Sequence, residues 1–303
     1  MLILKNTENF DKKLCPAVAL GTFDGVHRGH QKVLNSAVDS GYYPVALVIN
    51  RPLDKKNRSP ILVTPEQKNH LFETLGIKCL VDYEFEKICF LSPEVFVKEI
   101  LKNQLGAAYV SCGFNFKFGK NAAGDTDMLE SLCRQNGIML NVSCSENFEG
   151  KPVSSTRIRR ALEEGEPLQA AKMLSRYFSF DFPVLPGDKI GRTLDMPTIN
   201  QVFPQGFILP KCGVYAVNVQ IDGKNYKGVC NVGTRPTLDR TEFRAETNII
   251  GFSGNLYGKR PKVSLVEYIR DTKKFPSLKE LKAEVDRNIE YTERLQFEGD
   301  LIG

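Results

Sequence analysis

Two histidines in a short glycine-rich segment are the residues of this sequence best suited to chemistry. His27 and His30 lie in the decapeptide GTFDGVHRGH, residues 21–30, directly after the apolar run 17–20. Glycines in such a turn let backbone N–H groups approach phosphate oxygens, and the start of a helix favours negative charge. Histidines three residues apart share one face of the first helical turn. The segment therefore predicts a phosphate-binding turn that could stabilise the charge developing in adenylyl transfer.

Two further polar segments follow in the first half of the chain. Residues 113–119, GFNFKFG, place Asn115 among aromatic side chains, and residues 154–159, SSTRIR, combine hydroxyls with two arginines. A hydroxyl at a helix start is ordinary capping chemistry, and for this segment alone that is the commoner interpretation. Arginine can also bind phosphate oxygens through two parallel hydrogen bonds, so the same segment is suited to clamping a triphosphate.

The second half of the chain carries oxygen-rich segments. Residues 187–200, GDKIGRTLDMPTIN, surround a proline turn with glycines, and they end in Thr198 and Asn200. A polar loop of this kind usually only connects strands, and a single strand glutamate such as Glu246 is usually solvated.

The elements that position the first group of residues alternate along the chain. Apolar runs at 18–20, 43–49, 78–81 and 108–111 predict buried strands, and the stretch 93–105 has helical periodicity. This alternation predicts a parallel sheet with helices on both faces. Ligands bind such sheets at the carboxyl ends of the strands, where the glycine–histidine segment lies.

The pattern changes after residue 183. Strand-like runs at 213–219, 226–232, 246–250 and 262–268 follow one another without helices between them, which predicts an antiparallel sheet or small barrel. A final helix is predicted after the Ser277–Glu280 capping box, with Leu281, Val285 and Ile289 as its packing stripe. We expect two domains, residues 1–180 and 181–303.

Composition limits the function classes. The 303 residues are 42% apolar and 25% charged with a net charge of +5, and the basic residues are dispersed, so we expect no nucleic-acid partner. No apolar run is long enough to span a membrane and no signal peptide is evident, so we expect no membrane partner and a cytoplasmic location. The eight cysteines lack metal-ligand spacing, which favours reduced thiols.

The motifs together resemble one known family. GTFDGVHxGH, GxNFxFG and SSTRIR are similar to the adenylyltransferase module of the bacterial bifunctional riboflavin kinase/FAD synthetase (FMN adenylyltransferase) family. The segments at 187–200, 231–237 and 256–258 are similar to GxxxGRxLGxPTxN, NxGxRPT and LYG of its kinase module, with Asp195 in place of the glycine that follows leucine. The resemblance covers roughly residues 15–297 and keeps the family order. It implies an N-terminal Rossmann-like α/β nucleotidyltransferase domain, followed by a small antiparallel β-barrel riboflavin kinase domain with a C-terminal helix.

The resemblance also implies the reactions. The C-terminal domain would phosphorylate riboflavin to FMN with ATP, and the N-terminal domain would adenylylate FMN to FAD with release of pyrophosphate. His27, His30 and Glu246 would be the catalytic residues, Glu246 as general base toward the riboflavin hydroxyl. ATP and phosphate in the adenylyltransferase would be bound by Gly21, Thr22, Phe23, Asp24, Gly25, Asn115, Ser155, Thr156 and Arg157.

For the kinase, the resemblance implies an ATP and flavin site that includes a metal. Mg²⁺, bound together with ATP, would be held by Thr198 and Asn200. ATP and flavin would be bound by Gly187, Lys189, Gly191, Arg192, Pro197, Asn231, Arg235 and Tyr257. The partners would be riboflavin, FMN, FAD and ATP, and the chain would act as a monomer or weak transient oligomer.

The sequence departs from the family pattern at three places. Asn50-Arg51-Pro52 replaces a histidine-containing stretch, Asp195 stands at a usual glycine, and Gly251 stands at a usual acidic residue. Two alternatives therefore stay open. The chain could be a riboflavin kinase with an inactive or regulatory N-terminal nucleotide-binding domain, or a non-catalytic flavin sensor.

Overall fold

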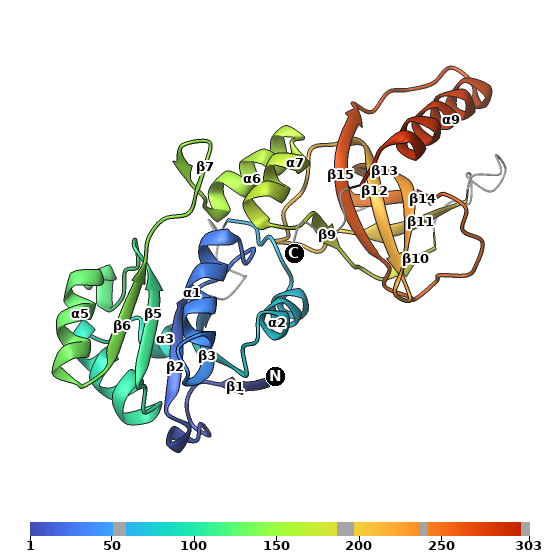
Figure 1. Cartoon of the computed structure of the whole chain (residues 1–303). Coiled ribbons are helices and arrows are strands. Elements are labelled where there is room, and N and C mark those ends of the chain that lie inside the picture. The colour runs from blue at the N-terminus through green and yellow to red at the C-terminus, as the bar shows by residue number, and fades with distance from the viewer. Residues whose placement is uncertain (51–58, 187–196, 237–240, 298–303) are drawn as a thin grey trace. The chain divides into compact units, whose positions relative to one another are not determined.

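The chain forms two compact units. The computed structural model describes residues 1–50, 59–186, 197–236 and 241–297. The units comprise Met1–Ser155 and Thr156–Gly303 (Figure 1). Among the helices that the structure describes, none combines the length and apolar composition needed to cross a membrane. Arg51 and Pro52, as well as Asp195, lie outside the described residues.

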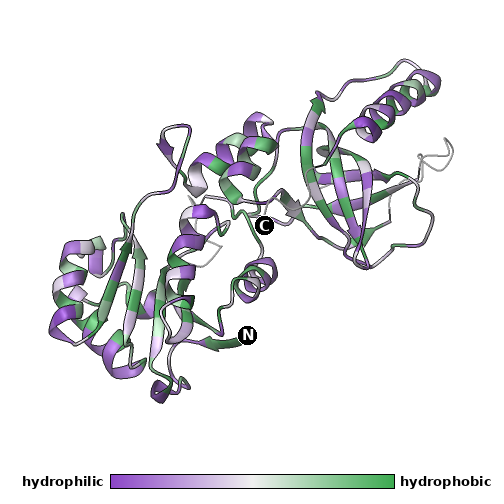
Figure 2. Ribbon diagram, in the orientation of Figure 1, coloured by the Kyte–Doolittle hydropathy of each residue, from purple (hydrophilic) through white to green (hydrophobic). Residues whose placement is uncertain are grey.

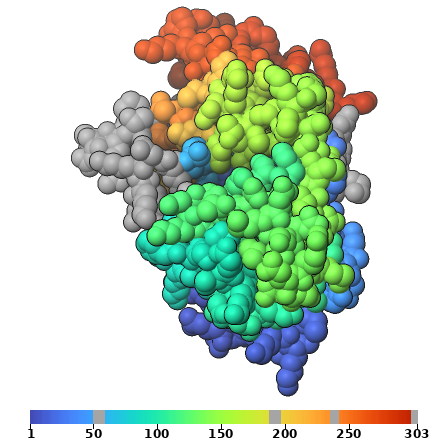
Figure 3. Space-filling view, turned by 90° about the vertical axis from the view of Figure 1, so that its left-hand side faces the viewer, coloured from blue at the N-terminus to red at the C-terminus, as the bar shows by residue number. Residues whose placement is uncertain are grey.

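The N-terminal unit alternates strands and helices. In chain order its described elements are β1 (Leu2–Lys5), η1 (Lys12–Leu14), β2 (Pro16–Gly21), α1 (Arg28–Val38), β3 (Tyr43–Asn50), α2 (Pro65–Thr74), β4 (Cys79–Glu84), α3 (Phe85–Ile88), α4 (Pro93–Val95), η2 (Phe96–Gln104), β5 (Tyr109–Gly113), η3 (Lys120–Ala122), α5 (Thr126–Gln135), β6 (Met139–Ser143), β7 (Asn147–Phe148) and β8 (Lys151–Pro152). The side of this unit formed by α5 and β6 faces the viewer in Figure 3.

The main sheet of this unit is parallel, as predicted. Its six described strands follow the order β1-β4-β3-β2-β5-β6. From β2 the chain continues to β3 on one side, whereas from β5 it continues to β6 on the other side. The carboxyl ends of β2 and β5 therefore lie at the point where the strand order reverses, which is where doubly wound sheets bind ligands.

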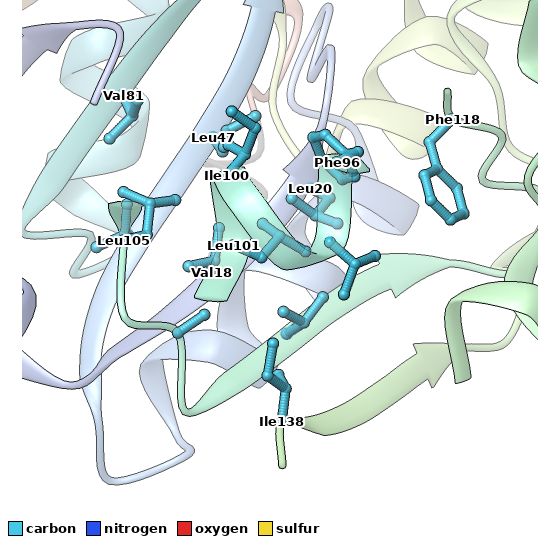
Figure 4. Packing of buried hydrophobic residues seen from close by; sticks show 14 of the residues in the cluster. Val18, Leu20, Leu47, Val81, Phe96, Ile100, Leu101, Leu105, Phe118 and Ile138 are labelled. Carbon is cyan, nitrogen blue, oxygen red and sulfur yellow. The ribbon is translucent and has the colours of Figure 1, made fainter. Parts of the chain in front are cut away.

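Apolar side chains cover both faces of this sheet. On one face, strand residues such as Val18, Leu47 and Val81 pack against η2 and α5, and Figure 4 shows this cluster at close range. On the other face, a second cluster joins Ala19 and Ala46 to α1 and α2. Figure 2 shows the apolar residues concentrated in the strands. Burial on both faces explains why the strands read as continuous apolar runs.

The predicted helix over 93–105 takes an unusual form. A short α-helical turn, α4, passes into η2, whose hydrogen bonds have the wider π-helical spacing. Four residues of η2 are buried: Phe96, Val97, Ile100 and Leu101. The wider turn keeps these side chains on the side facing the sheet. Apolar periodicity alone does not distinguish this wider helix from an α-helix.

The second unit is mainly antiparallel. Its described elements are α6 (Ser155–Glu164), α7 (Pro167–Leu174), β9 (Phe178–Phe180), β10 (Val184–Leu185), β11 (Thr198–Val202), β12 (Gly213–Ile221), β13 (Lys224–Pro236), β14 (Thr241–Ile249), β15 (Lys262–Arg270) and α9 (Leu278–Arg294). The described strands pair antiparallel in the order β10-β11-β14-β13-β12-β15-β9. This curled sheet with a C-terminal helix confirms the predicted fold class.

The helix α9 begins where the sequence predicts, but its buried face differs. The Ser277 hydroxyl accepts a hydrogen bond from the backbone N–H of Glu280. The buried residues of α9 are polar: Glu284, Asn288 and Thr292. The predicted stripe of Leu281, Val285 and Ile289 is only half-buried beside them. Ion pairs from Glu284 to Arg270, Lys273 and Arg287 allow a carboxylate to occupy this face.

Candidate active sites

The glycine–histidine turn begins at the end of β2. Gly21 ends the strand, and a Cβ added there would lie 3.0 Å from the ring of Phe23. Phe23 and Val26 have positive φ angles of 49° and 42°, and Gly25 has 80°. The Phe23 ring folds back over the strand end and is 1% exposed. The turn is therefore tight, and Gly21 is needed because a larger side chain would displace that ring.

Asp24 holds the turn in place. Its carboxylate Oδ1 accepts a hydrogen bond from the backbone N–H of Leu62 at 2.9 Å, and its carbonyl accepts one from Ser155 Oγ at 2.8 Å. Lys68 Nζ donates to the carbonyl of Thr22 at 3.1 Å. In this structure Asp24 and Ser155 brace the turn, whereas the resemblance implies that they contact phosphate.

The two histidines form a stacked pair at the start of α1. His27 is the N-cap residue, and its Nδ1 accepts a hydrogen bond from the backbone N–H of His30 at 3.3 Å. The ring centroids lie 3.6 Å apart with 17° between the planes, and Phe23 meets His30 edge-on. A neutral imidazole that accepts at Nδ1 carries its proton at Nε2. His27 therefore carries its Nε2–H donor at the positive end of the helix.

Asn115 lies at the corresponding end of the neighbouring strand. It follows Gly113, the last residue of β5, and β5 pairs directly with β2. Asn115 is exposed and Phe114 beside it is 47% exposed. The sheet therefore brings the Asn115 loop and the glycine–histidine turn to one edge. Thr156 and Arg157 follow Ser155 in the first turn of α6, in the second compact unit.

Charged residues that the sequence did not single out lie near the histidine turn. Glu146 forms ion pairs with Arg28 at 3.4 Å and with Lys32 at 3.0 Å. Arg28 and Lys32 both belong to α1, so Glu146 partly neutralises the positive residues that follow the histidines. Nothing in the local sequence around Glu146 indicates this pairing, because its partners lie more than a hundred residues away.

In the second unit, three polar residues lie in one row across three strands. Glu246 on β14 pairs with Asn200 on β11 and with Asn231 on β13. Directly paired residues on one face have Cβ atoms about 5 Å apart. Ala245 and Thr247, on either side of Glu246, are fully buried, so strand alternation places Glu246 on the outer face of the sheet.

The neighbouring pair extends this polar face. Thr198 pairs with Asn248, two residues along each strand from the pair of Asn200 and Glu246, and therefore on the same face. Asn248 Nδ2 donates to the carbonyl of Pro197 at 3.1 Å, which fixes the entry into β11. Further along β14, Arg244 forms an ion pair with Glu242 on the same face. The sequence did not single out Arg244, since its alignment with Glu246 depends on the strand being formed.

The donors on this face suit a hard metal ion that a nucleotide also binds. Thr198 offers a hydroxyl and Asn200 an amide oxygen, both oxygen ligands, and Glu246 adds a carboxylate beside them. Within the described ranges, no group of three His, Cys, Asp or Glu residues could hold a metal by itself. Such a set fits a metal ion that takes most of its ligands from phosphates and water.

Several predicted kinase residues cannot be placed as fully. Pro197 is exposed directly before β11, and Tyr257 is 44% exposed in the turn before β15. Arg235 belongs to β13, opposite Glu242. The loop residues Gly187, Lys189, Gly191 and Arg192 lie outside the described residues.

Two family models match this chain, one in each part of the sequence. The family model described as FAD synthetase matches residues 11–157, and the one described as riboflavin kinase matches residues 174–296. A bifunctional riboflavin kinase/FMN adenylyltransferase of Haemophilus influenzae is 30% identical over 302 residues, covering 96% of this chain and 97% of its own. A protein of the same description from Bacillus subtilis is 33% identical over 285 residues, covering 89% of each chain.

A solved structure also matches nearly the whole chain. A protein from Streptococcus pneumoniae, described as a macrolide-efflux protein, superposes with a TM-score of 0.88. It is 25% identical and covers 97% of this chain and 99% of its own. Its fold therefore agrees with the fold of this chain along its length, although its description differs from those of the curated relatives.

Proposed function

The chain belongs to the bifunctional riboflavin kinase/FMN adenylyltransferase family, and on that premise we propose how its residues perform the two reactions. The C-terminal half phosphorylates riboflavin to FMN, and the N-terminal half adenylylates FMN to FAD. We assign these activities to residues 181–303 and 1–180 respectively. The observation that carries the assignment is the row Asn200, Glu246 and Asn231, which gathers a base and oxygen ligands on one face.

In the kinase, Glu246 acts as the general base. Its carboxylate accepts the proton of the riboflavin 5′-hydroxyl as that oxygen attacks the γ-phosphorus of ATP, and ADP leaves with the electrons of the broken P–O bond. Enzymes that use ATP in this way need a divalent metal. We infer Mg²⁺, held by Thr198 and Asn200, where it would neutralise phosphate charge. Asn231 beside Glu246 orients the carboxylate or the flavin hydroxyl.

The remaining kinase residues bind the two substrates. We assign Pro197, Arg235 and Tyr257, together with the loop residues Gly187, Lys189, Gly191 and Arg192, to ATP and flavin binding. Tyr257 is 44% exposed, and an aromatic ring of this kind can stack on a flavin.

In the adenylyltransferase, the histidine pair stabilises charge on the ATP phosphates. An FMN phosphate oxygen attacks the α-phosphorus, and pyrophosphate leaves without a covalent enzyme intermediate. His27 donates from Nε2 to a phosphate oxygen, and His30 acts beside it. Backbone groups of residues 21–25 contact phosphate, Asn115 binds the nucleotide or flavin phosphate, and Ser155, Thr156 and Arg157 close the site. Catalysis then rests on position and charge.

The efflux description of the Streptococcus pneumoniae structure is not extended to this chain, because both family models and the curated relatives describe flavin enzymes. We propose a cytoplasmic protein, which agrees with the eight cysteines being free thiols, all of them in described residues. We also propose a monomer or weak transient oligomer whose ligands are riboflavin, FMN, FAD and ATP.

Two reactions followed by chromatography test the proposal. Purified protein is incubated with ATP and Mg²⁺, once with riboflavin and once with FMN. FAD in both reactions is the expected result. FMN without FAD would instead leave a kinase with a silent N-terminal domain, and no product in either reaction would favour a flavin sensor.

A further inference from the structure

A buried amide lies directly behind the row of polar residues in the kinase. Gln201 follows Asn200 on β11, and alternation along the strand turns its side chain to the opposite, inner face of the sheet. Gln201 is completely buried. A polar side chain in this position must be held by hydrogen bonds, because an unpaired buried amide is costly.

The amide of Gln201 joins two backbone carbonyls from different parts of the unit. Its Nε2 donates to the carbonyl of Phe182 at 2.5 Å and to that of Pro261 at 3.1 Å. Only the nitrogen of the amide has hydrogens to donate to two carbonyl oxygens, so its orientation is fixed by chemistry. Its Oε1 has no hydrogen-bond partner among the described residues.

These bonds join β11 to two segments outside the strands, one before β10 and one before β15. β10 and β9 are the two edges, and β11 lies next to β10. Phe182 lies between β9 and β10, whereas Pro261 directly precedes β15 near the opposite edge. The side chain of Gln201 therefore closes the curled sheet at a place where its edge strands do not pair with each other.

The turn before β15 is attached at the same place. Val184 on β10 donates its N–H to the carbonyl of Lys259 at 2.9 Å, and the N–H of Gly258 donates to the carbonyl of Val184 at 3.0 Å. Tyr257, assigned above to substrate binding, belongs to this turn. Gln201 therefore bonds to Phe182, just before β10, and to Pro261, just after the turn 256–259. These two bonds flank the backbone contact between β10 and the turn.

We propose that Gln201 is a positioning residue of the kinase site, which fixes β11 with Thr198 and Asn200 relative to the turn that carries Tyr257. The inference rests on the proposed kinase function. The amide satisfies the carbonyls of Phe182 and Pro261, which an apolar side chain could not do, and in doing so it ties β11 to the segments that carry them. Its hydrogen bond to Pro261 thereby helps to set the distance between β11 and the adjoining turn that carries Tyr257.

The first test compares the two activities of one variant. Gln201→Met keeps the length of the side chain and removes both hydrogen bonds. We expect the KM for magnesium–ATP in riboflavin phosphorylation to rise about tenfold, with a smaller change in kcat, because two modest bonds are lost. FAD formation from FMN is expected to stay within about twofold. An unchanged KM for magnesium–ATP would overturn the proposal.

A readout without catalysis tests the connection itself. Hydrogen exchange of the backbone amides in residues 198–202 and 258–261 should speed up in Gln201→Met, whereas exchange in β12 should not change. Val219→Ala is the matched control, since Val219 is also fully buried but lies on β12. If Val219→Ala raises the KM for magnesium–ATP as much as Gln201→Met does, the effect is general destabilisation and the proposal is wrong.

A second variant retains a test if Gln201→Met does not fold. Gln201→Asn keeps the amide but withdraws it by one methylene from the carbonyls of Phe182 and Pro261. The KM for magnesium–ATP in riboflavin phosphorylation should rise as in Gln201→Met, while FAD formation from FMN should not change. An unchanged KM for magnesium–ATP would contradict the proposal. Failure of the unsubstituted chain to form FMN would refute the proposed function. The hydrogen-exchange measurement would still test whether Gln201 holds residues 198–202 and 258–261 together, because it does not depend on catalysis.

Discussion

Glu246 and Asn200 lie directly opposite each other on neighbouring antiparallel strands. This register brings a proposed base and a proposed metal ligand within about 5 Å at the Cβ atoms. A shift of one residue in either strand would turn one of the two side chains into the interior. The pairing of β14 with β13 adds Asn231 on the other side of Glu246, so the kinase site depends on the register of three strands.

Replacing the base should separate the two activities. Glu246→Gln retains the shape of the side chain but cannot accept the hydroxyl proton, so we expect riboflavin phosphorylation to fall by about 10²- to 10⁴-fold. FAD formation from FMN should be unchanged. Steady-state assays of each reaction measure both effects. Glu290→Gln, at an exposed position of α9, is the control, and full FMN production by Glu246→Gln would remove the assignment.

The histidine pair should affect only the other reaction. His27→Asn keeps a side chain that can cap α1 but loses the imidazole donor, so we expect FAD formation to fall by roughly 10²- to 10³-fold. Riboflavin phosphorylation and the thermal unfolding temperature should change little. Chromatography of products and circular dichroism give the two readouts. A loss of both activities would indicate unfolding, and unchanged FAD formation would contradict the role of His27.

The sequence predicts well the features that depend on local pattern. The alternation of apolar runs with helical stretches predicts the parallel sheet, because each strand is buried on both faces. The glycine–histidine turn is equally local, since Gly21, Phe23 and His27 interact within a few residues. Its place at the end of a strand follows from the apolar run before it.

Features that depend on distant partners could not be predicted in this way. The row at Glu246 requires the sheet register, and the pairing of Glu146 with Arg28 and Lys32 joins remote segments. The apolar spacing in α9 predicts the wrong buried residues, because Glu284 is neutralised by cations from outside the helix, including Arg270. Periodicity contains no information about such partners.

Gly21 offers a steric test of the turn. Gly21→Ala would place a Cβ 3.0 Å from the buried ring of Phe23, so the ring or the turn must move at a cost of about 1–3 kcal/mol. FAD formation should decrease because His30 packs against the same ring. Gly113→Ala is the control for stability, since its Cβ would make only an ordinary 3.5 Å contact. Equal unfolding temperatures for both variants would contradict this account.

The ion pairs of Glu284 predict how stability depends on pH. Hydrogen bonds from Lys273 and Arg287 lower the pKa of Glu284 from its ordinary value of 4.5 to about 2. A carboxylate whose pKa is lower in the folded state contributes stability that is complete above about pH 4.5 and is lost as the pH falls toward 2. Glu284→Gln removes this contribution, so the variant should lose less stability than the unsubstituted chain over that interval.

Urea unfolding followed by circular dichroism at pH 6, 4 and 3 measures this difference. Glu290→Gln is again the matched control, because Glu290 is exposed and its contact with Arg294 is long, at 3.9 Å. Its urea midpoint should follow that of the unsubstituted chain at each pH. Parallel loss of stability in Glu284→Gln and in the unsubstituted chain between pH 6 and pH 3 would show that the ion pairs do not hold α9 against the sheet.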